Sequence, residues 1–376
     1  MAIHVSTQFD GGRIEVIEAQ HAARIRLKIA KDSASDFCQW FYCRVDGIAQ
    51  QETVLSLENA GQSSYPKWEG YHVLASYDRE TWFRIPTEFM DGMLIARHTP
   101  TMNAVYYAYF TPYSHERHLD LLAQAQCSEF STLLNLGASA QGRTMDCLKI
   151  TEAHPHTTQH KKIVWVIARQ HPGETMAEWC AEGLVTRLLD PDDALAKVLR
   201  EQAIFYIIPN MNPDGAFLGN LRTNACGANL NREWMAPSLE SSPEVYWVRQ
   251  KIYETGVDCF LDLHGDEQLP YVFLAGCEGV PKYSEKQKQR AQIFKETLRA
   301  VNPDFQTEFG YSVDAPGEAN LTLATDYIGE HFGCLAYTLE MPFKDNANLP
   351  DPDTGWSAER SLLLGASLLH PISAVL

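Results

Sequence analysis

A change of pattern near residue 111 constrains the fold of this chain more than any other feature. Before it, short segments rich in β-branched and aromatic residues are separated by turn sequences such as Asp10-Gly11-Gly12. After it, apolar strand-like runs alternate with segments of helical character. Short, regular strands favour an antiparallel β-sandwich, and strand–helix alternation favours a mixed or parallel sheet flanked by helices. We therefore expect an antiparallel β-sandwich domain over residues 1–115 and an α/β domain over residues 116–376.

The expected elements can be placed by residue number. The β domain should contain strands near 13–17, 23–29, 39–45, 52–57 and 105–110. The α/β domain should begin with a helix at 115–125 and continue with strands at 162–168, 203–209, 258–264, 271–275 and 334–341. Its later helices should cover 175–189, 242–255, 284–300 and 357–369.

A candidate metal site lies between the expected strand at 162–168 and the expected helix at 175–189. Here the sequence reads His171-Pro172-Gly173-Glu174, so an imidazole and a carboxylate share one turn and can reach one metal ion. A second apolar strand-like run ends in His264. Two imidazole nitrogens and one carboxylate oxygen are a typical catalytic zinc set, with the fourth position left for water.

The His-x-x-Glu spacing alone is a weak signal, because the chain has 13 histidines and also contains a second match from His264 to Glu267. His171 and Glu174 could instead cap the following helix, since an acid in the first turn satisfies free N–H groups. His264 could be an interior histidine whose ring is oriented by Asp262. The first match gains weight because other polar segments follow strand-like runs, where ligands of open α/β sheets collect.

Those other segments supply two arginines, an asparagine and an acid. Arg222, Asn231 and Arg232 follow the turn sequence at 210–215 in a loop rich in Gly and Asn. Loop arginines are usually solvated, but a guanidinium binds a carboxylate bidentately, so this set suits recognition of a free carboxyl group. Glu340 lies within an apolar run, where an acid is either ion-paired or functional. Beside a metal-bound water, such an acid is the usual general base.

Composition limits the partners and the cellular compartment. With 31 Lys and Arg against 48 Asp and Glu, the net charge is −17, which disfavours nucleic acids and anionic membranes as partners. No run approaches the length of a transmembrane helix, and the amino terminus has no signal-peptide pattern. The nine cysteines are scattered and mostly apolar in context, which favours reduced thiols and a cytoplasmic location. Nothing in the sequence indicates an oligomeric state.

Together these motifs resemble the zinc metallocarboxypeptidases of the carboxypeptidase A type. The shared order is His-x-x-Glu, Asn-Pro-Asp-Gly, an arginine, Asn-Arg, a histidine after a strand, and a late glutamate, and it covers about residues 116–376. The resemblance implies the zinc carboxypeptidase fold, a mixed sheet of the eight-stranded type flanked by helices. A β-rich amino-terminal domain without a signal-peptide pattern is similar to the cytosolic carboxypeptidase branch, in the form of its bacterial members.

The resemblance also implies roles for single residues. It implies one zinc ion per chain, with His171, Glu174 and His264 as its ligands. Glu340 is similar to the general base. Among the polar loop residues, it implies that Arg222 stabilises the oxyanion. It also implies that Asn231 and Arg232 bind the terminal carboxylate of the substrate.

The sequence departs from the family pattern in two places. The mobile tyrosine of the family lies some twenty residues before the catalytic glutamate, where this chain has Glu318. Tyr311 matches only with a gap and is the candidate for this substrate-binding tyrosine, whereas Tyr327 lies too close in sequence. Relatives that cut after acidic side chains carry a basic residue in the specificity segment, but residues 301–343 contain no Lys or Arg. We therefore expect no preference for polyglutamate ends over neutral ones.

The predicted function is a zinc-dependent carboxypeptidase that hydrolyses the last peptide bond of a peptide or protein. Three other zinc activities use the same ligand set: a deacylase or amidase acting on small N-acyl amino acids, a γ-glutamyl peptidase, and a protein deglutamylase. A fourth alternative is a binding module with a degenerate enzyme domain. The retention of the ligand set and of Glu340 argues against this last alternative.

Overall fold

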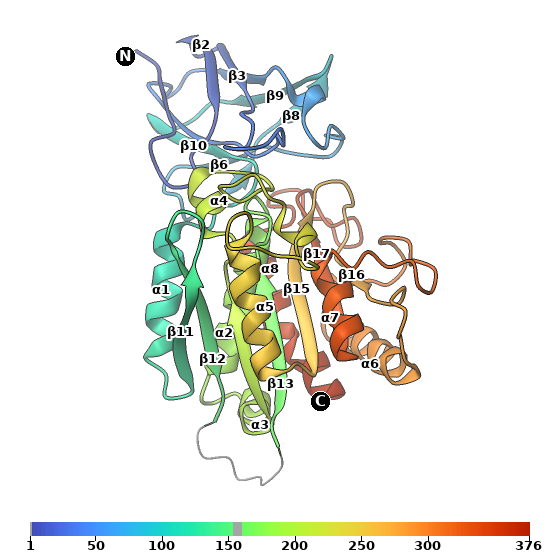
Figure 1. The fold of residues 1–376 in the computed structure, drawn as a ribbon. Helices are drawn as coiled ribbons and strands as arrows, with labels where there is room; N and C mark the ends of the chain where they lie inside the picture. The colour runs from blue at the N-terminus through green and yellow to red at the C-terminus, as the bar shows by residue number, and fades with distance from the viewer. Residues whose placement is uncertain (1, 153–159) are drawn as a thin grey trace.

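The computed structural model describes residues 2–152 and 160–376, which form a β region above an α/β region in the view of Figure 1. Within the described part of the β region, ten strands form two five-stranded sheets, ordered β1-β4-β10-β6-β7 and β2-β3-β5-β9-β8. Their bounds are β1 His4–Ser6, β2 Glu15–His21, β3 Arg24–Lys28, β4 Tyr42–Asp46, β5 Thr53–Leu57, β6 Leu74–Ser76, β7 Phe83–Arg84, β8 Thr87–Met90, β9 Met93–His98 and β10 Ala104–Ala108.

The two sheets of the β region share one core, as a sandwich requires. Ile25 and Leu55 from one sheet and Val45 and Tyr107 from the other are all buried in it. The expected antiparallel pairing holds except between β3 and β5, which run parallel. The reason is topological. The chain forms β4 in the other sheet before it returns as β5, and such a crossover connection brings two strands of one sheet into parallel alignment.

The α/β region is built on a mixed seven-stranded sheet in the order β11-β12-β14-β13-β15-β17-β16 among the described residues. The strands are β11 Ser131–Ala138, β12 Thr144–Ile150, β13 Lys162–Ala168, β14 Ala203–Ile208, β15 Cys259–Asp266, β16 Phe273–Gly276 and β17 Leu335–Pro342. The four central strands, from β14 to β17, run parallel to one another, and the outer pairs are antiparallel. The predicted mixed sheet flanked by helices is confirmed.

Helices cover both faces of this sheet (Figure 1). They are α1 His115–Gln126, α2 Thr175–Leu189, α3 Ala194–Gln202, α4 Pro213–Leu218, α5 Pro243–Thr255, α6 Glu285–Val301, α7 Ala324–Phe332, α8 Ala358–Ser367 and α9 Leu369–Val375. Successive side chains of a strand point to opposite faces. In β13, Val164 and Val166 therefore share a core with α2 and α8, whereas Trp165 and Ile167 pack in a second core with α5 and α7.

Over residues 2–152 and 160–376, the sheet has seven strands where the family resemblance implies eight. Next to β16, an isolated parallel bridge between Val272 and Phe305 continues the sheet. The chain turns directly after it, because the Gln306 side chain accepts hydrogen bonds from the backbone N–H groups of Glu308 and Phe309. The remaining strand is thus reduced to one pair of residues.

Over the described ranges, none of the helices combines the length and the apolar character that crossing a membrane would need.

Candidate active site

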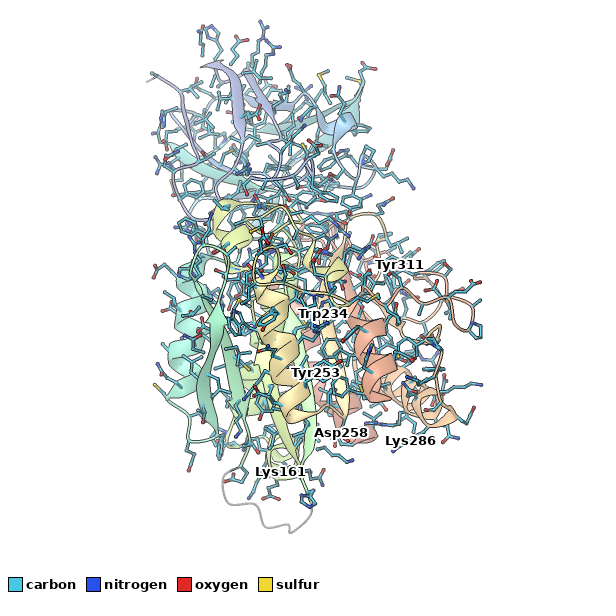
Figure 2. All side chains as sticks on the ribbon, viewed as in Figure 1. Lys161, Trp234, Tyr253, Asp258, Lys286 and Tyr311 are labelled. Carbon is cyan, nitrogen blue, oxygen red and sulfur yellow. The ribbon has the colours of Figure 1, made fainter. Side chains whose placement is uncertain are left out.

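The central parallel strands end together on the side of the sheet that faces the β region. Figure 2 shows Lys161 and Asp258, which precede β13 and β15, at the far end of the α/β region, and Tyr311 near the β region. His264 on β15 lies directly opposite Glu340 on β17 in the strand register. The fold therefore brings residues more than 160 positions apart, from His171 to Glu340, to one edge.

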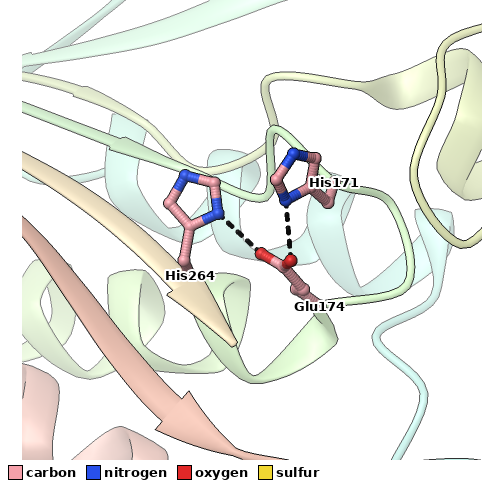
Figure 3. A group of neighbouring side chains, drawn as sticks. All are labelled: His171, Glu174 and His264. Atoms are coloured by element: carbon pink, nitrogen blue, oxygen red, sulfur yellow. Dashed lines mark hydrogen bonds and ion pairs between the residues drawn. The ribbon is translucent and has the colours of Figure 1, made fainter. Parts of the chain in front are cut away.

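His171, Glu174 and His264 form one buried cluster, and their ligand atoms all lie within 4.8 Å of one another (Figure 3). The Nδ1 atoms of His171 and His264 are each 2.7 Å from a different carboxylate oxygen of Glu174. Although Glu174 is the N-cap residue of α2, its side chain makes no capping hydrogen bond. The helix-capping alternative is therefore wrong for Glu174, and the donor set fits a catalytic zinc ion.

Burial and charge prepare His171 and Glu174 to bind a cation. Burial, aided by the positive charge of Arg222, lowers the pKa of His171 to about 4, so its imidazole carries a free lone pair at neutral pH. Although burial opposes it, the neighbouring His171 and His264 hold the pKa of Glu174 below its ordinary value. Glu174 is therefore an ionised ligand, as metal binding requires.

The side chains behind the cluster fix its geometry. Asp262 Oδ2 lies 2.9 Å from His264 Nε2 and also accepts a hydrogen bond from Gln170 Nε2 at 2.7 Å. Asn229 Oδ1 lies 3.0 Å from His171 Nε2. Asp262 thus orients the ring of His264, a role that is compatible with His264 as a metal ligand. Such partners select the tautomer of each imidazole and leave Nδ1 of both rings directed at the metal position.

The loop that carries His171 also packs against the Asn-Pro-Asp-Gly segment. Asn212 caps α4 by accepting a hydrogen bond from Gly215 N. Gly215 is necessary here, because a Cβ atom at this position would lie 2.4 Å from Pro172 Cγ. The segment at 210–215 is therefore a structural support that turns the chain toward Arg222.

Glu340 is buried beside the cluster with one carboxylate oxygen free. Its Oε2 has no hydrogen-bond partner within the described chain. Burial, with a further contribution from Glu174, raises the pKa of Glu340 to about 8. No Lys or Arg of the described residues forms an ion pair with it, so the ion-pair alternative receives no support. A buried acid with a raised pKa and a free oxygen is suited to proton transfer.

Tyr311 reaches the same point from a loop. Its hydroxyl donates to Asp266 Oδ2 at 2.5 Å and lies 3.2 Å from Glu340 Oε1. Tyr327 lies elsewhere, with its hydroxyl 2.8 Å from that of Tyr253 on α5. The geometry therefore favours Tyr311, the residue that the family spacing reaches only with a gap.

A cavity of about 430 Å³ connects these groups and includes Arg222, Asn231 and Arg232 in its lining. Asn231 Oδ1 accepts a hydrogen bond from Ala324 N at 2.9 Å, which ties the loop to the start of α7. Arg232 Nη1 donates to the carbonyl of Asn231 at 2.6 Å. The three candidate metal ligands, Glu340 and two guanidinium groups thus line one cavity.

Comparisons with known proteins decide the family. Residues 116–357 match the model of the zinc carboxypeptidase family, and residues 5–110 match the cytosolic carboxypeptidase N-terminal domain. This chain belongs to the zinc carboxypeptidase family. It is thus a metallocarboxypeptidase by family, with zinc as its cofactor, and the predicted cytosolic carboxypeptidase branch is confirmed.

Related proteins match the carboxypeptidase along nearly its whole length. A metallo-carboxypeptidase from Burkholderia cenocepacia is 48% identical, with a TM-score of 0.95 over 99% of this chain and 98% of that one. One from Pseudomonas aeruginosa, solved with (2-guanidinoethylmercapto)succinic acid, is 48% identical, with a TM-score of 0.95 over 98% of both chains. Cytosolic carboxypeptidase 6 of Caenorhabditis elegans is 27% identical over 89% of this chain and 77% of its own.

Sequence reasoning missed the groups that the β region contributes. Tyr65 lines the cavity, and Asp32 bonds to the backbone of the loop that carries Arg222. No spacing rule could find them, because both belong to a separate region more than 100 residues before His171. Asp266 was also missed. It could have been found from its position, two residues after His264 at the end of a buried strand.

Proposed function

We propose that this zinc carboxypeptidase removes the last residue from peptides or proteins that end in a free carboxyl group. The observation that carries the proposal is the free Oε2 of buried Glu340 beside the His171, Glu174 and His264 cluster. Arg222 and Arg232 line the same cavity. The buried acid, the metal ligands and the groups that can bind a carboxylate therefore face one cavity.

His171, Glu174 and His264 would hold the zinc ion. When bound, zinc lowers the pKa of a coordinated water to about 7 and polarises the carbonyl of the scissile bond. Glu340 accepts the proton of the attacking water and returns it to the leaving amine. Tyr311, within reach of Glu340, closes the cavity on the bound chain end.

The two arginines have different tasks. Arg222 donates to the oxyanion that develops at the scissile carbonyl, where one well-placed donor contributes about 3–4 kcal/mol. Arg232 and Asn231 bind the terminal carboxylate, because a guanidinium fork matches a carboxylate in geometry and charge. Since only a chain end presents this group, the pair restricts the enzyme to C-terminal cleavage. The succinic acid compound bound by the Pseudomonas aeruginosa protein supports a site that accepts carboxylates.

The alternative zinc activities are less well supported. A deacylase, an amidase or a γ-glutamyl peptidase would need the metal cluster and a base, but not the full set of Arg222, Asn231 and Arg232. A deglutamylase needs a free cation for the terminal side chain. Lys295 enters the cavity from α6, but its Nζ lies 3.1 Å from Glu278 Oε1. The lysine is therefore already neutralised.

We also propose a domain boundary at residues 115/116 and a cytoplasmic location. The boundary is supported by the N-cap of α1, where the Ser114 side chain accepts from Arg117 N. The location is supported by the word cytosolic in the name of the nematode relative and by the nine cysteines, all free. The net charge of −17 supports peptides rather than nucleic acid as partners.

A panel of peptides that differ only in the final residue tests the proposed function. With zinc-loaded enzyme, mass spectrometry should show stepwise loss of single C-terminal residues. Release of an acyl group from an N-acyl amino acid, with every peptide intact, would favour the deacylase alternative and contradict the proposal.

A further inference from the structure

The β region holds the loop that carries Arg222 through one buried carboxylate. Asp32 Oδ1 accepts a hydrogen bond from Leu221 N at 2.6 Å. Asp32 Oδ2 accepts from Arg222 N at 3.0 Å, and from Thr223 N at 2.9 Å and Thr223 Oγ1 at 3.0 Å. Asp32 is only 6% exposed, so three consecutive residues of the loop are fixed to one buried side chain from the other region.

The Arg222 side chain also depends on the β region. Its guanidinium carbon lies 5.4 Å from the ring centroid of Phe37 and 5.9 Å from that of Tyr65. Over the described residues, the guanidinium makes no hydrogen bond to a protein atom. Cation–π contacts orient it while its N–H groups stay available to a ligand. Both the backbone and the charged group of Arg222 are thus placed by residues before 66 in the sequence.

The same loop supports the metal-ligand turn. Leu221 O accepts a hydrogen bond from Gly173 N at 2.8 Å, and Gly173 lies between His171 and Glu174. A Cβ atom at Gly173 would lie 3.0 Å from Leu221 O, so the two segments are in close contact. In Figure 1, α4, which leads into this loop, lies directly beneath the β region. Arg13 Nη1 donates to the carbonyl of Leu218, the last residue of α4, at 3.1 Å.

We propose that Asp32 is a positioning residue for catalysis, which acts by holding Arg222 where the oxyanion develops. The β region is then part of the catalytic apparatus rather than a separate appendage. This inference rests on the role of Arg222 in the proposed function. A purely structural contact between two regions would not require four donors from three consecutive residues to converge on one carboxylate. Nor would it require two aromatic rings to lie at the guanidinium.

A double-mutant cycle in the full-length zinc enzyme tests this inference. Asp32→Asn removes one acceptor oxygen at nearly constant size and places an amide donor against the N–H groups of the loop. We expect kcat/KM on a good peptide substrate to fall roughly 10- to 100-fold, mainly through kcat, with zinc content unchanged. In an Arg222→Ala background, the same change should have almost no further effect, because the group on which Asp32 acts is already absent.

The matched control is Asp36→Asn, in the same segment of the β region. Asp36 is exposed and bonds to Lys31 Nζ at 2.7 Å, so its loss should leave kcat/KM unchanged. If Asp32→Asn keeps parental kcat/KM, or if its effect multiplies with that of Arg222→Ala, the inference is overturned. If Arg222→Ala itself is fully active, the proposed role of Arg222 fails instead.

A second variant covers the case in which Asp32→Asn does not yield folded protein. Phe37→Leu removes one ring at the guanidinium and leaves Asp32 and its hydrogen bonds intact. A fall in kcat/KM that disappears in the Arg222→Ala background supports positioning by the β region. A fall of equal size in both backgrounds contradicts it.

Discussion

Replacement of Glu340 by Gln is the perturbation that most sharply separates metal binding from catalysis. Glutamine is nearly isosteric and can keep Oε1 near the Tyr311 hydroxyl, which lies 3.2 Å away. Its amide nitrogen would take the place of Oε2, the oxygen without a partner in the described chain, and cannot accept a proton. Glu340 is not in the His171, Glu174 and His264 cluster, so the variant should still bind zinc.

The expected loss follows from the task of the residue. General-base catalysis contributes about 10²- to 10⁴-fold. The barrier should therefore rise by about 3–5 kcal/mol, at ~1.36 kcal/mol per factor of ten. The assay is steady-state kcat and KM on one peptide, together with zinc content by mass spectrometry. We expect kcat to fall by this factor with zinc still stoichiometric.

The control for Glu340→Gln is Glu330→Gln on the neighbouring helix α7. Glu330 is buried outside the cavity and pairs with Lys282, with its Oε1 2.9 Å from Lys282 Nζ. This change should leave kcat unaltered. Near-parental kcat in Glu340→Gln would refute the assignment of the base. Glu267, a buried acid that lines the same cavity, would then be the next candidate.

Three further predictions concern zinc, specificity and pH. His171→Ala combined with Glu174→Ala should abolish stoichiometric zinc, because a single remaining ligand is too few for a tight site; retained zinc would refute the ligand set. A peptide ending in Leu should have a kcat/KM roughly tenfold or more above one ending in Glu, because the acids Asp314 and Asp326 line the cavity. A higher value for the peptide ending in Glu would restore the deglutamylase alternative. Burial lowers the pKa of His118, but Asp146 and Glu178 outweigh it and raise this pKa to about 9. The ion pairs of His118 therefore stabilise the fold fully below about pH 6.5, and this stabilisation is lost as the pH rises through 9. His118→Gln should therefore lower Tm more at pH 6 than at pH 10, and an equal loss at both values would contradict this.

The sequence predicts the central elements well because strong local signals coincide there. The bounds of β13 and α2 agree with the expected 162–168 and 175–189, since an apolar run is followed by His-Pro-Gly-Glu and a long apolar helix. β11 and β12 were missed. β11 is only partly buried along its length, so it lacks the apolar run that marks the inner strands. Local patterning thus recovers the central strands and the edge strand β16, but loses the antiparallel pair β11 and β12 at the other edge.

The site shows the same limit. His171, Glu174, His264 and Glu340 are predictable because each lies at or just after the carboxyl end of a buried strand, which places it at the same edge of the sheet. Tyr311 could not be assigned by spacing, since a loop can lengthen without moving the hydroxyl at its tip. Groups that enter from another region or another helix, such as Asp32 and Lys295, have no sequence relation to the motifs and emerge only from the tertiary structure.

The central claim is that this enzyme recognises and cleaves at a free C-terminus, and a pair of twin peptides tests it most directly. One peptide ends in a free carboxylate and the other in a carboxamide, and both are incubated together with the zinc-loaded enzyme. Mass spectrometry should show loss of the last residue from the free peptide while the amidated twin stays intact, because Arg232 and Asn231 find no carboxylate on it. Equal cleavage of both peptides would contradict the account.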